Sequence, residues 1–381
     1  MKVCVSVWGR FHAFNLAQQL QKRGYLQKLI STYPAFAITK YGIDQKLIHS
    51  LWQLEALSRG WYKLPRWMRG DRNLQLWFLE QFDRSVTNYL SPEFDLFVGW
   101  SGSNYWSVHR AKELGAKTII ERGSSHMHYQ TEILTEEYEK WGLSFTETHP
   151  GIYEREIQAY DDADRIAIAS LFVKRTFLAQ GIPESKLILV PYGTSLAEFY
   201  PVAKQDNIFR VIHCGSLSLR KGVQYLLQAF WELNLPNAEL WLVGSITPEI
   251  EPFIAKYQSD RILIKGTHPQ QKLRWFYSQC SVFSLASIED GFGMVIPQAM
   301  ACGLPVIHTT NTGGEDIVRN EIDGFCIPIR DIEALKTKIL FFYENPDKRD
   351  EMGKNALEQA RQSLTWDDYG EKITNAYLQI C

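Results

Sequence analysis

The sequence predicts an α/β protein that contains two parallel-sheet domains. Short apolar runs rich in Val, Ile and Leu alternate with stretches of helical periodicity along the whole chain, as in buried parallel strands joined by helices. Several of these runs end at a glycine, such as Gly9, Gly215 or Gly244, which is typical of a strand-to-helix turn. The length of 381 residues corresponds to about two domains of ordinary size, at roughly 150 residues each.

The first domain is placed at residues 1–190. The apolar run 3–7 predicts its first strand, and apolar residues from Phe14 to Leu20 predict a helix that Gly24 ends. Further strands are expected at 95–99, 117–121, 165–169 and 187–190, with a helix at 108–114.

The second domain is placed at residues 208–363, after an irregular linker at 191–207. Residues 364–381 are expected to form a final helix, with Thr365 as its N-cap and two acidic residues in its first turn. Strands are expected at 209–215, 239–243, 262–264, 282–285, 305–308 and 324–327, and a helix at 222–233.

The composition excludes several classes of protein. Lys and Arg number 41 against 43 Asp and Glu, so the chain has no overall field for a polyanion, and no nucleic-acid partner is expected. The six cysteines include no CxxC pair, which favours free thiols in a reducing compartment. No apolar run approaches 18 residues and no signal-peptide pattern opens the chain, so we expect a cytoplasmic protein, with the inner membrane face as an option.

Ligands of open parallel sheets bind at the carboxyl ends of the strands, and two loops there carry suitable residues. Gly9 is not part of a G-x-G-x-x-G motif, and the segment 215–222 is not a Walker A motif. That segment nevertheless places Arg220 and Lys221 directly before a helix, where cations suit a diphosphate. Taken alone, such a pair is more often a solvated surface feature.

The segment 289–307 is the stronger signal. Gly291 and Gly293 follow an expected strand and allow the backbone to approach a ligand closely. An acidic side chain at the start of this loop and a polar one on the next helix are suited to sugar and ribose hydroxyls. As an ordered string of residues, this segment is far more specific than a single glycine-rich turn.

The segment 289–307 resembles the signature of retaining glycosyltransferase family 4, the glycosyl transferases group 1, which have the GT-B fold. Gly215 with Arg220-Lys221-Gly222, the segment 242–244 and the segment 311–325 are similar to the same family. The resemblance covers the second half densely and the first half thinly. It implies two Rossmann-like domains that face a central cleft, with the final helix crossing back to the first domain.

The resemblance also implies the reaction and the residues that carry it. The reaction is retaining transfer of a sugar from a nucleotide-sugar donor to a hydroxyl of a glycan or lipid-linked saccharide, with no metal and no other cofactor. Arg220 and Lys221 would hold the donor diphosphate, and the Gly9 loop would face it. The residues that would supply backbone donors to sugar and phosphate are Gly291, Phe292, Gly293, Met294 and Val295.

The chain departs from the family at two acidic positions. The family carries two glutamates, and here the first falls on Asp290, a catalytic candidate, and the second on Gln298, a donor-binding candidate. Glu289 is adjacent to Asp290 and could substitute for it. The uncharged Gln298 leaves a second hypothesis open, a catalytically silent nucleotide-sugar-binding protein. A third, a GT-B-shaped epimerase, is disfavoured by the family strings.

Two histidines are further candidates. His126 follows the expected strand 117–121, and the resemblance places a catalytic histidine that contacts the donor sugar there; a surface loop histidine is the alternative. His268 lies where the family binds the nucleotide base and is a weaker candidate for that contact.

Two charged segments have competing interpretations. The acidic run Asp161–Asp164 suggests a metal site, but the end of a helix and the entry to a strand explain it better, and no metal is predicted. The segment 59–72 mixes five basic residues with two Trp and one Tyr, a composition suited to peripheral contact with an anionic membrane. Packing of its rings on the first domain is the equally weighted alternative.

Overall fold

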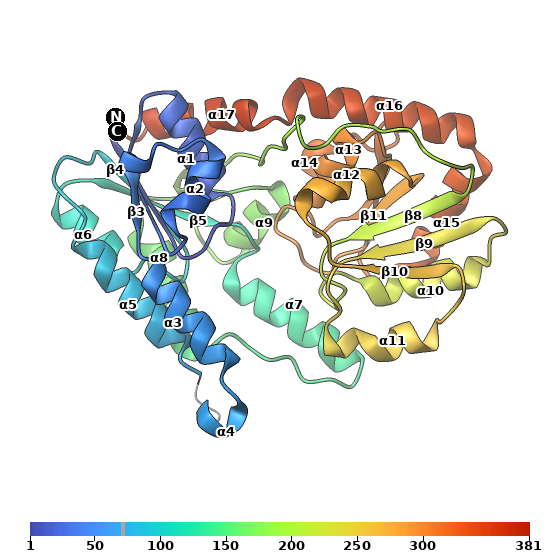
Figure 1. Cartoon of the computed structure of the whole chain (residues 1–381), viewed down its shortest axis with the longest axis horizontal. Helices are drawn as coiled ribbons and strands as arrows, with labels where there is room; N and C mark the ends of the chain where they lie inside the picture. Colours follow the sequence, from blue (N-terminus) through green and yellow to red (C-terminus); the bar gives the residue numbers. More distant parts are fainter. Residues whose placement is uncertain (70–72) are drawn as a thin grey trace.

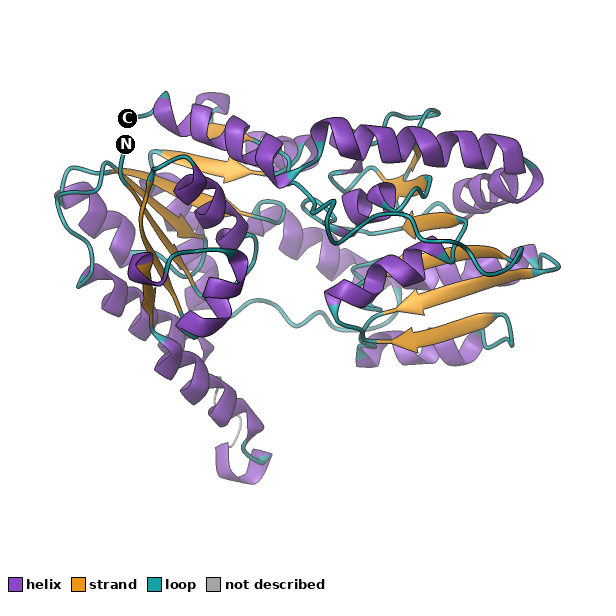
Figure 2. Ribbon diagram, turned by 45° about the horizontal axis from the view of Figure 1, so that its top comes forward, coloured by secondary structure: helices purple, strands orange, loops and turns teal. Residues whose placement is uncertain are grey.

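The computed structural model, which describes residues 1–69 and 73–381, confirms the two-domain α/β prediction. Each domain has one fully parallel sheet with helices on both faces (Figures 1 and 2). Because both faces are covered, the central strands are mainly apolar, and all five residues of β1 (Val3–Val7) and of β4 (Leu96–Trp100) are buried.

The first sheet has seven strands in the order β3-β2-β1-β4-β5-β6-β7. The expected strands are present within about one residue of their predicted bounds, and β2 and β3 are additional. The remaining strands are β2 (Leu26–Ser31), β3 (Ile48–Ser50), β5 (Lys117–Arg122), β6 (Arg165–Ile168) and β7 (Leu187–Leu189). The helices are α1 (Ala13–Lys22), α2 (Ala35–Ile38), α3 (Trp52–Lys63), α4 (Arg66–Arg69), α5 (Gln75–Thr87), α6 (Trp106–Glu113), α7 (Met127–Lys140), α8 (Pro150–Asp162) and α9 (Leu171–Ala179).

The second sheet has six strands in the order β10-β9-β8-β11-β12-β13, and every strand that the sequence predicts for this half is present. Its strands are β8 (Phe209–Cys214), β9 (Ala238–Val243), β10 (Ile262–Gly266), β11 (Val282–Leu285), β12 (Val306–Thr309) and β13 (Gly324–Ile327). Its helices are α10 (Val223–Leu233), α11 (Glu251–Lys256), α12 (Gln270–Ser278), α13 (Val295–Ala301), α14 (Gly314–Ile317), α15 (Ile332–Glu344) and α16 (Pro346–Ser363).

The last helix, α17 (Trp366–Leu378), returns from the second domain to the first and packs on α1 (Figure 1). Thr365 caps it in a capping box with Asp368. The Tyr377 hydroxyl donates to Glu121 Oε1 at 3.0 Å, and Lys22 pairs with Asp367 at 2.7 Å. The chain therefore crosses between the domains twice, once through the stretch after β7 and once before α17.

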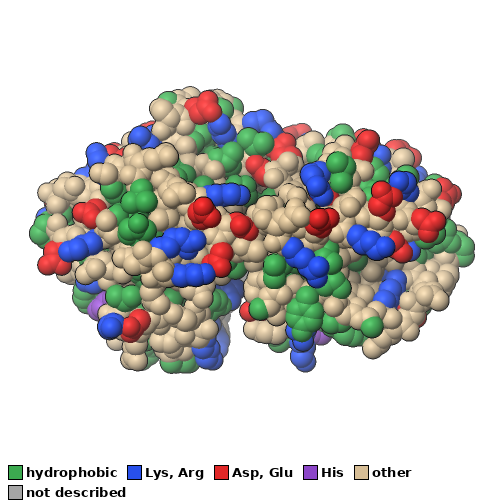
Figure 3. Space-filling view, turned by 90° about the horizontal axis from the view of Figure 1, so that it is seen from above, with side chains coloured by type: hydrophobic (Ala, Val, Ile, Leu, Met, Phe, Trp, Pro, Cys, Tyr) green, Lys and Arg blue, Asp and Glu red, His purple; other side chains and the backbone are tan. Residues whose placement is uncertain are grey.

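Charged side chains of both signs are interspersed over the face seen in Figure 3, in keeping with the near-zero net charge. Among the described residues, no helix is both long enough and apolar enough to cross a bilayer.

Candidate functional site

The carboxyl ends of the two sheets face each other, and the loops that follow them touch. The Ser125 backbone N–H, beyond β5, donates to Glu289 Oε1 at 3.0 Å, and Ser170 Oγ donates to the Gly291 carbonyl at 2.5 Å. A cavity of about 240 Å³ lies between these loops. It is lined by Gly123, Tyr192, Cys214, Gly215, Lys221, Leu285, Asp290, Phe292, Gly293, Met294 and Val295.

The loop between β8 and α10 brings Lys221 to this cavity. Gly222 has a left-handed backbone with φ +65°, and a Cβ there would overlap the carbonyl oxygen of Ala286. The start of α10 therefore lies directly against the end of β11. This close approach holds the lysine next to the glycine-rich loop that begins at Asp290.

Lys221 is paired with Asp290 in this structure. The ammonium contacts Asp290 Oδ2, while Asp290 Oδ1 accepts from the Gly293 backbone N–H at 3.2 Å. The two side chains are 18% and 14% exposed, so a ligand in the cavity can reach both. An anionic ligand would compete with Asp290 for the lysine.

Glu289 lies at the domain interface, with a fully buried side chain. Arg220 Nε donates to its Oε2 at 2.8 Å, and the first domain donates from Ser125 and from Gln130 Nε2. Burial alone would raise the pKa of this carboxyl, but the Arg220 charge and these hydrogen bonds lower it to about 2. Arg220 and Glu289 thus join the domains and do not line the cavity.

The glycine loop is pressed against the first domain. A Cβ on Gly291 would overlap the Gly123 carbonyl oxygen. The Phe292 ring, which is buried, meets the Tyr192 ring edge to face at 5.2 Å. Because Gly291 has no side chain, the backbone of the first domain can lie directly against it. Gly293 and Met294 border the cavity.

His126 lies inside the first domain and not at the cavity where the sequence places it. It is the N-cap of α7, its Nδ1 accepts from the His128 N–H at 3.2 Å, and its ring packs between Tyr160 and Phe177. Burial and the nearby Arg122 lower the pKa of His126 to about 4, so this histidine is neutral at pH 7. The arrangement suits helix capping better than contact with a sugar.

Three other predicted residues are not among those that line the cavity. Gly9 has φ +85° and its N–H donates to Thr32 Oγ1 at 3.0 Å, which fixes the loop after β1. Gln298, on α13, accepts from the buried Tyr277 hydroxyl through Oε1 at 3.4 Å. His268 follows β10, and its Nε2 lies 2.9 Å from the Lys265 carbonyl oxygen.

A second interdomain contact was missed by the sequence reasoning. Glu137, near the end of α7, is fully buried and accepts from Gln224, Tyr225 and Trp141 through one oxygen. Its other oxygen pairs with Arg330 at 2.6 Å. No local pattern marks these residues, because the contact exists only once α7 lies across the second domain.

The acidic run Asp161–Asp164 has the structural role that the sequence favours. Asp161 and Asp162 end α8, and Asp164 accepts from the Thr118 N–H and hydroxyl at the entry to β5. Among the described residues no three His, Cys, Asp or Glu side chains gather as a metal site.

The segment 59–72 extends from the first domain as α3 and α4 (Figure 1). Residues 70–72 lie outside the described part. Trp67, Met68 and Tyr62 are 83%, 54% and 42% exposed, so these rings and this thioether do not pack fully on the domain.

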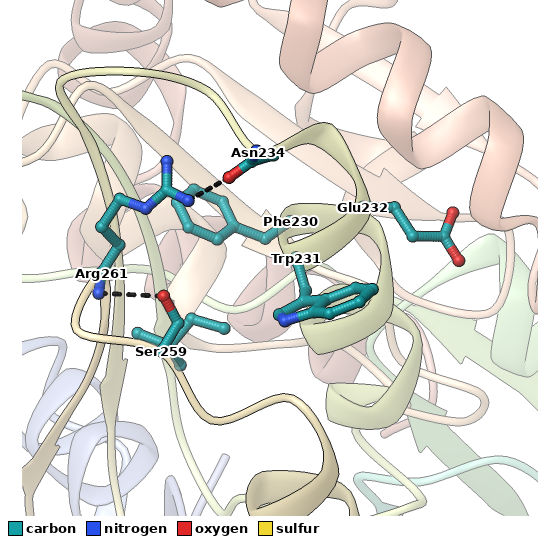
Figure 4. A pocket seen from close by; sticks show the side chains of 7 residues that line it. Phe230, Trp231, Glu232, Asn234, Ser259 and Arg261 are labelled. Atoms are coloured by element: carbon teal, nitrogen blue, oxygen red, sulfur yellow. Dashed lines mark hydrogen bonds between the residues drawn. The ribbon is translucent and has the colours of Figure 1, made fainter.

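A second cavity, of about 330 Å³, lies at the opposite edge of the second sheet, before β10 (Figure 4). Arg261, on its wall, already donates to Asn234 and to the Leu235 carbonyl. Trp231 forms the other side. Arg261 therefore links the segment after α10 to the start of β10, away from the loops that line the first cavity.

Comparison with known proteins agrees with this geometry. Residues 198–359 match the family described as glycosyl transferases group 1, which confirms the resemblance of the second half. Over 222 residues the chain is 30% identical to an uncharacterized glycosyltransferase, MJ1178, of Methanocaldococcus jannaschii, covering 58% of this chain and 61% of that protein. It is 26% identical to the capsular polysaccharide biosynthesis glycosyltransferase CapM of Staphylococcus aureus, covering 57% and 62%. Both alignments span less than two thirds of the relative.

Solved structures share the whole fold. Sucrose-phosphate synthase of Thermosynechococcus elongatus superposes with a TM-score of 0.76 at 20% identity, covering 100% of this chain and 99% of that one. Alr3699/HepE of Anabaena, in complex with UDP, superposes with a TM-score of 0.70 at 15% identity over 100% of both chains. The architecture is therefore GT-B.

Proposed function

We propose that this GT-B chain, whose second domain matches the glycosyl transferases group 1, transfers a sugar from a nucleotide-sugar to an acceptor hydroxyl. The acceptor is a carbohydrate or a lipid-linked saccharide, and the anomeric configuration is retained. The observation that carries the proposal is the cavity between the facing carboxyl edges, with Lys221 on its wall. The UDP bound by the Anabaena protein supports a nucleotide donor.

In this proposal Lys221 releases Asp290 and binds the donor diphosphate, with Arg220 beside it. The bond between the anomeric carbon and the diphosphate oxygen breaks as a bond to the acceptor oxygen forms on the same face. The acceptor proton passes to the leaving diphosphate, whose growing charge the cations stabilise. Backbone N–H groups from Gly291 to Val295 would hold the sugar and phosphate.

Metal independence is part of the proposal. Lys221 on the cavity wall, with Arg220 next to it in the chain, would supply positive charge at the point where a diphosphate leaves, which is the task a divalent ion performs in metal-dependent transferases. The acidic run Asp161–Asp164 ends α8 and leads into β6, so this run gives no reason to propose a metal site there.

The test is a thermal-stabilisation screen with nucleotide-sugars, because a ligand that binds only the native state raises the melting temperature. The donor that stabilises the protein is then incubated with candidate acceptors, and NMR of the product reports the anomeric configuration. Stabilisation without any release of nucleoside diphosphate would favour the alternative hypothesis of a catalytically silent nucleotide-sugar-binding protein. That hypothesis rests on the uncharged Gln298.

We also propose that the α3–α4 region rests on an anionic membrane at the inner face. α3 has no buried residue, and Trp67 is the most exposed large apolar side chain among those described. Exposed Lys63 lies on the same segment and suits anionic head groups. Trp67→Ala should reduce co-sedimentation with vesicles containing phosphatidylglycerol, whereas Trp231→Ala, at a half-exposed Trp of the second domain, should not. Equal sedimentation of both variants and wild type would refute the contact.

A further inference from the structure

Two exposed aromatic rings, Phe11 in the loop after β1 and Phe36 in the short helix α2 after β2, are not packed against the protein. Phe11 is 67% exposed and Phe36 is 70% exposed, values that exceed those of nearly all other large apolar side chains in the described chain. Both follow strands of the first sheet, so they lie at its carboxyl edge, the edge that faces the cavity.

The backbone of Phe11 is in an unfavourable conformation. Its φ is +42°, in the left-handed region that bulky residues rarely adopt. The preceding Gly9 is fixed by bonds to β2, since Ser31 Oγ donates to the Gly9 carbonyl at 2.9 Å. A strained residue that gains no buried contact is a feature of ligand-binding loops.

Two cations accompany the rings. Arg10 Nη1 donates to the Tyr41 hydroxyl at 2.6 Å, and Lys40 Nζ lies 6.0 Å from the centre of the Phe36 ring. Both are exposed, and within residues 1–69 and 73–381 neither forms an ion pair with a carboxylate. Neighbouring Lys46, by contrast, is paired with Asp44 at 3.3 Å. The loops therefore carry uncompensated positive charge beside exposed rings.

The loop after β1 adjoins the cavity. His12 follows Phe11, is buried, and stacks on Tyr192 with ring centres 4.0 Å apart. Tyr192 lines the cavity. His12 therefore connects the loop after β1, which carries Arg10 and Phe11, to a residue of the cavity wall.

We propose that Arg10, Phe11, Phe36 and Lys40 form the acceptor subsite and that the acceptor carries an anionic group, a phosphate or carboxylate, beside an apolar or ring-shaped part. The guanidinium and ammonium would bind the anion, and the rings would pack on the adjacent part of the acceptor. The inference rests on the proposed function and adds the chemical class of the acceptor. An anion on a soluble sugar and one on a lipid share this chemistry.

The test compares charged and neutral probes of matched shape by calorimetry. The soluble pair is glucose 6-phosphate and glucose, and the lipid-like pair is farnesyl phosphate and farnesol in dilute detergent. Wild type should bind the phosphate of at least one pair ten times or more tightly than its neutral counterpart. The pair that shows the preference identifies the source of the anion.

The double variant Arg10→Ala/Lys40→Ala should abolish this preference, and the control Lys46→Ala should keep it. Phe11→Gly should weaken probe binding without lowering the melting temperature, because glycine adopts the left-handed backbone freely. Two results would overturn the proposal: no preference in wild type, or a preference that survives in the double variant.

Nucleoside diphosphates titrated into the same samples separate this proposal from the function itself. Unchanged nucleotide affinity in the double variant supports an acceptor role. A loss of nucleotide affinity would assign the cations to the donor and overturn the inference. Absence of nucleotide binding in wild type would count against the proposed function, whatever the phosphate probes show.

Discussion

Replacing Glu289 by glutamine should destabilise the protein strongly at neutral pH. The carboxyl is fully buried and its pKa is lowered from 4.5 to about 2, chiefly by Arg220 against the opposing effect of burial. A difference of this size corresponds to about 3–4 kcal/mol of stability, at about 1.4 kcal/mol for each pKa unit. Removing one partner of a buried ion pair lowers the stability by a similar amount, about 3–5 kcal/mol.

The sign of the pH dependence follows from the lowered pKa. Between the folded value near 2 and the unfolded value near 4.5, the unfolded chain binds more protons. The stabilisation is therefore complete above pH 4.5 and is lost as the pH falls toward 2. Glu289→Gln lacks this titration, so the difference in free energy of unfolding between wild type and variant should decrease as the pH falls over the same interval.

Urea unfolding followed by tryptophan fluorescence at pH 7, 4 and 3 measures this gap. The matched control is Asp367→Asn, which breaks the pair with Lys22, whose side chains are about 60% exposed. An exposed pair contributes under about 1 kcal/mol, so the control should stay close to wild type. The reasoning is refuted if Glu289→Gln matches the control at pH 7, or if its gap does not change with pH.

Two further predictions concern the donor. Gln298→Glu should tighten nucleotide binding by ~1 kcal/mol, because a carboxylate accepts ribose hydroxyls more strongly than an amide. Calorimetry decides this, and weaker binding would mean that the pocket is specialised for the amide whose oxygen accepts from Tyr277. Turnover should persist in excess chelator, because cationic side chains hold the diphosphate; complete loss that manganese restores would overturn metal independence.

The sequence predicts the second sheet fully but omits β2 and β3 of the first. β2 contains Gln27 and Lys28, and β3 has three residues at the sheet edge, so neither shows a continuous apolar run. β2 is held by pairing with β1 and β3 by pairing with β2, and the local sequence pattern does not report such pairing.

The residues of the candidate site likewise include some that the sequence pattern predicts and some that it does not. Gly215, Lys221 and Asp290 could be predicted together because each lies in a loop between the carboxyl end of a strand and the next helix, and parallel strands bring those loops to one edge. The interdomain roles of Glu289 and Glu137 could not, because their partners lie on the facing domain. His126 directly precedes α7 and caps it, a local role that its position after β5 does not distinguish from contact with a ligand.

The proposal that a donor diphosphate is held at Lys221, between the loop after β8 and the loop after β11, is tested most directly by calorimetric titration with UDP, GDP and ADP. At least one should bind wild type, and the double variant Arg220→Ala/Lys221→Ala should bind it at least tenfold more weakly. Because Arg220→Ala leaves Glu289 buried without its partner, the single variant Lys221→Ala is measured beside it as the better-folded case. Unchanged affinity in folded Lys221→Ala and in the folded double variant, or no nucleoside diphosphate bound by wild type, would contradict the account.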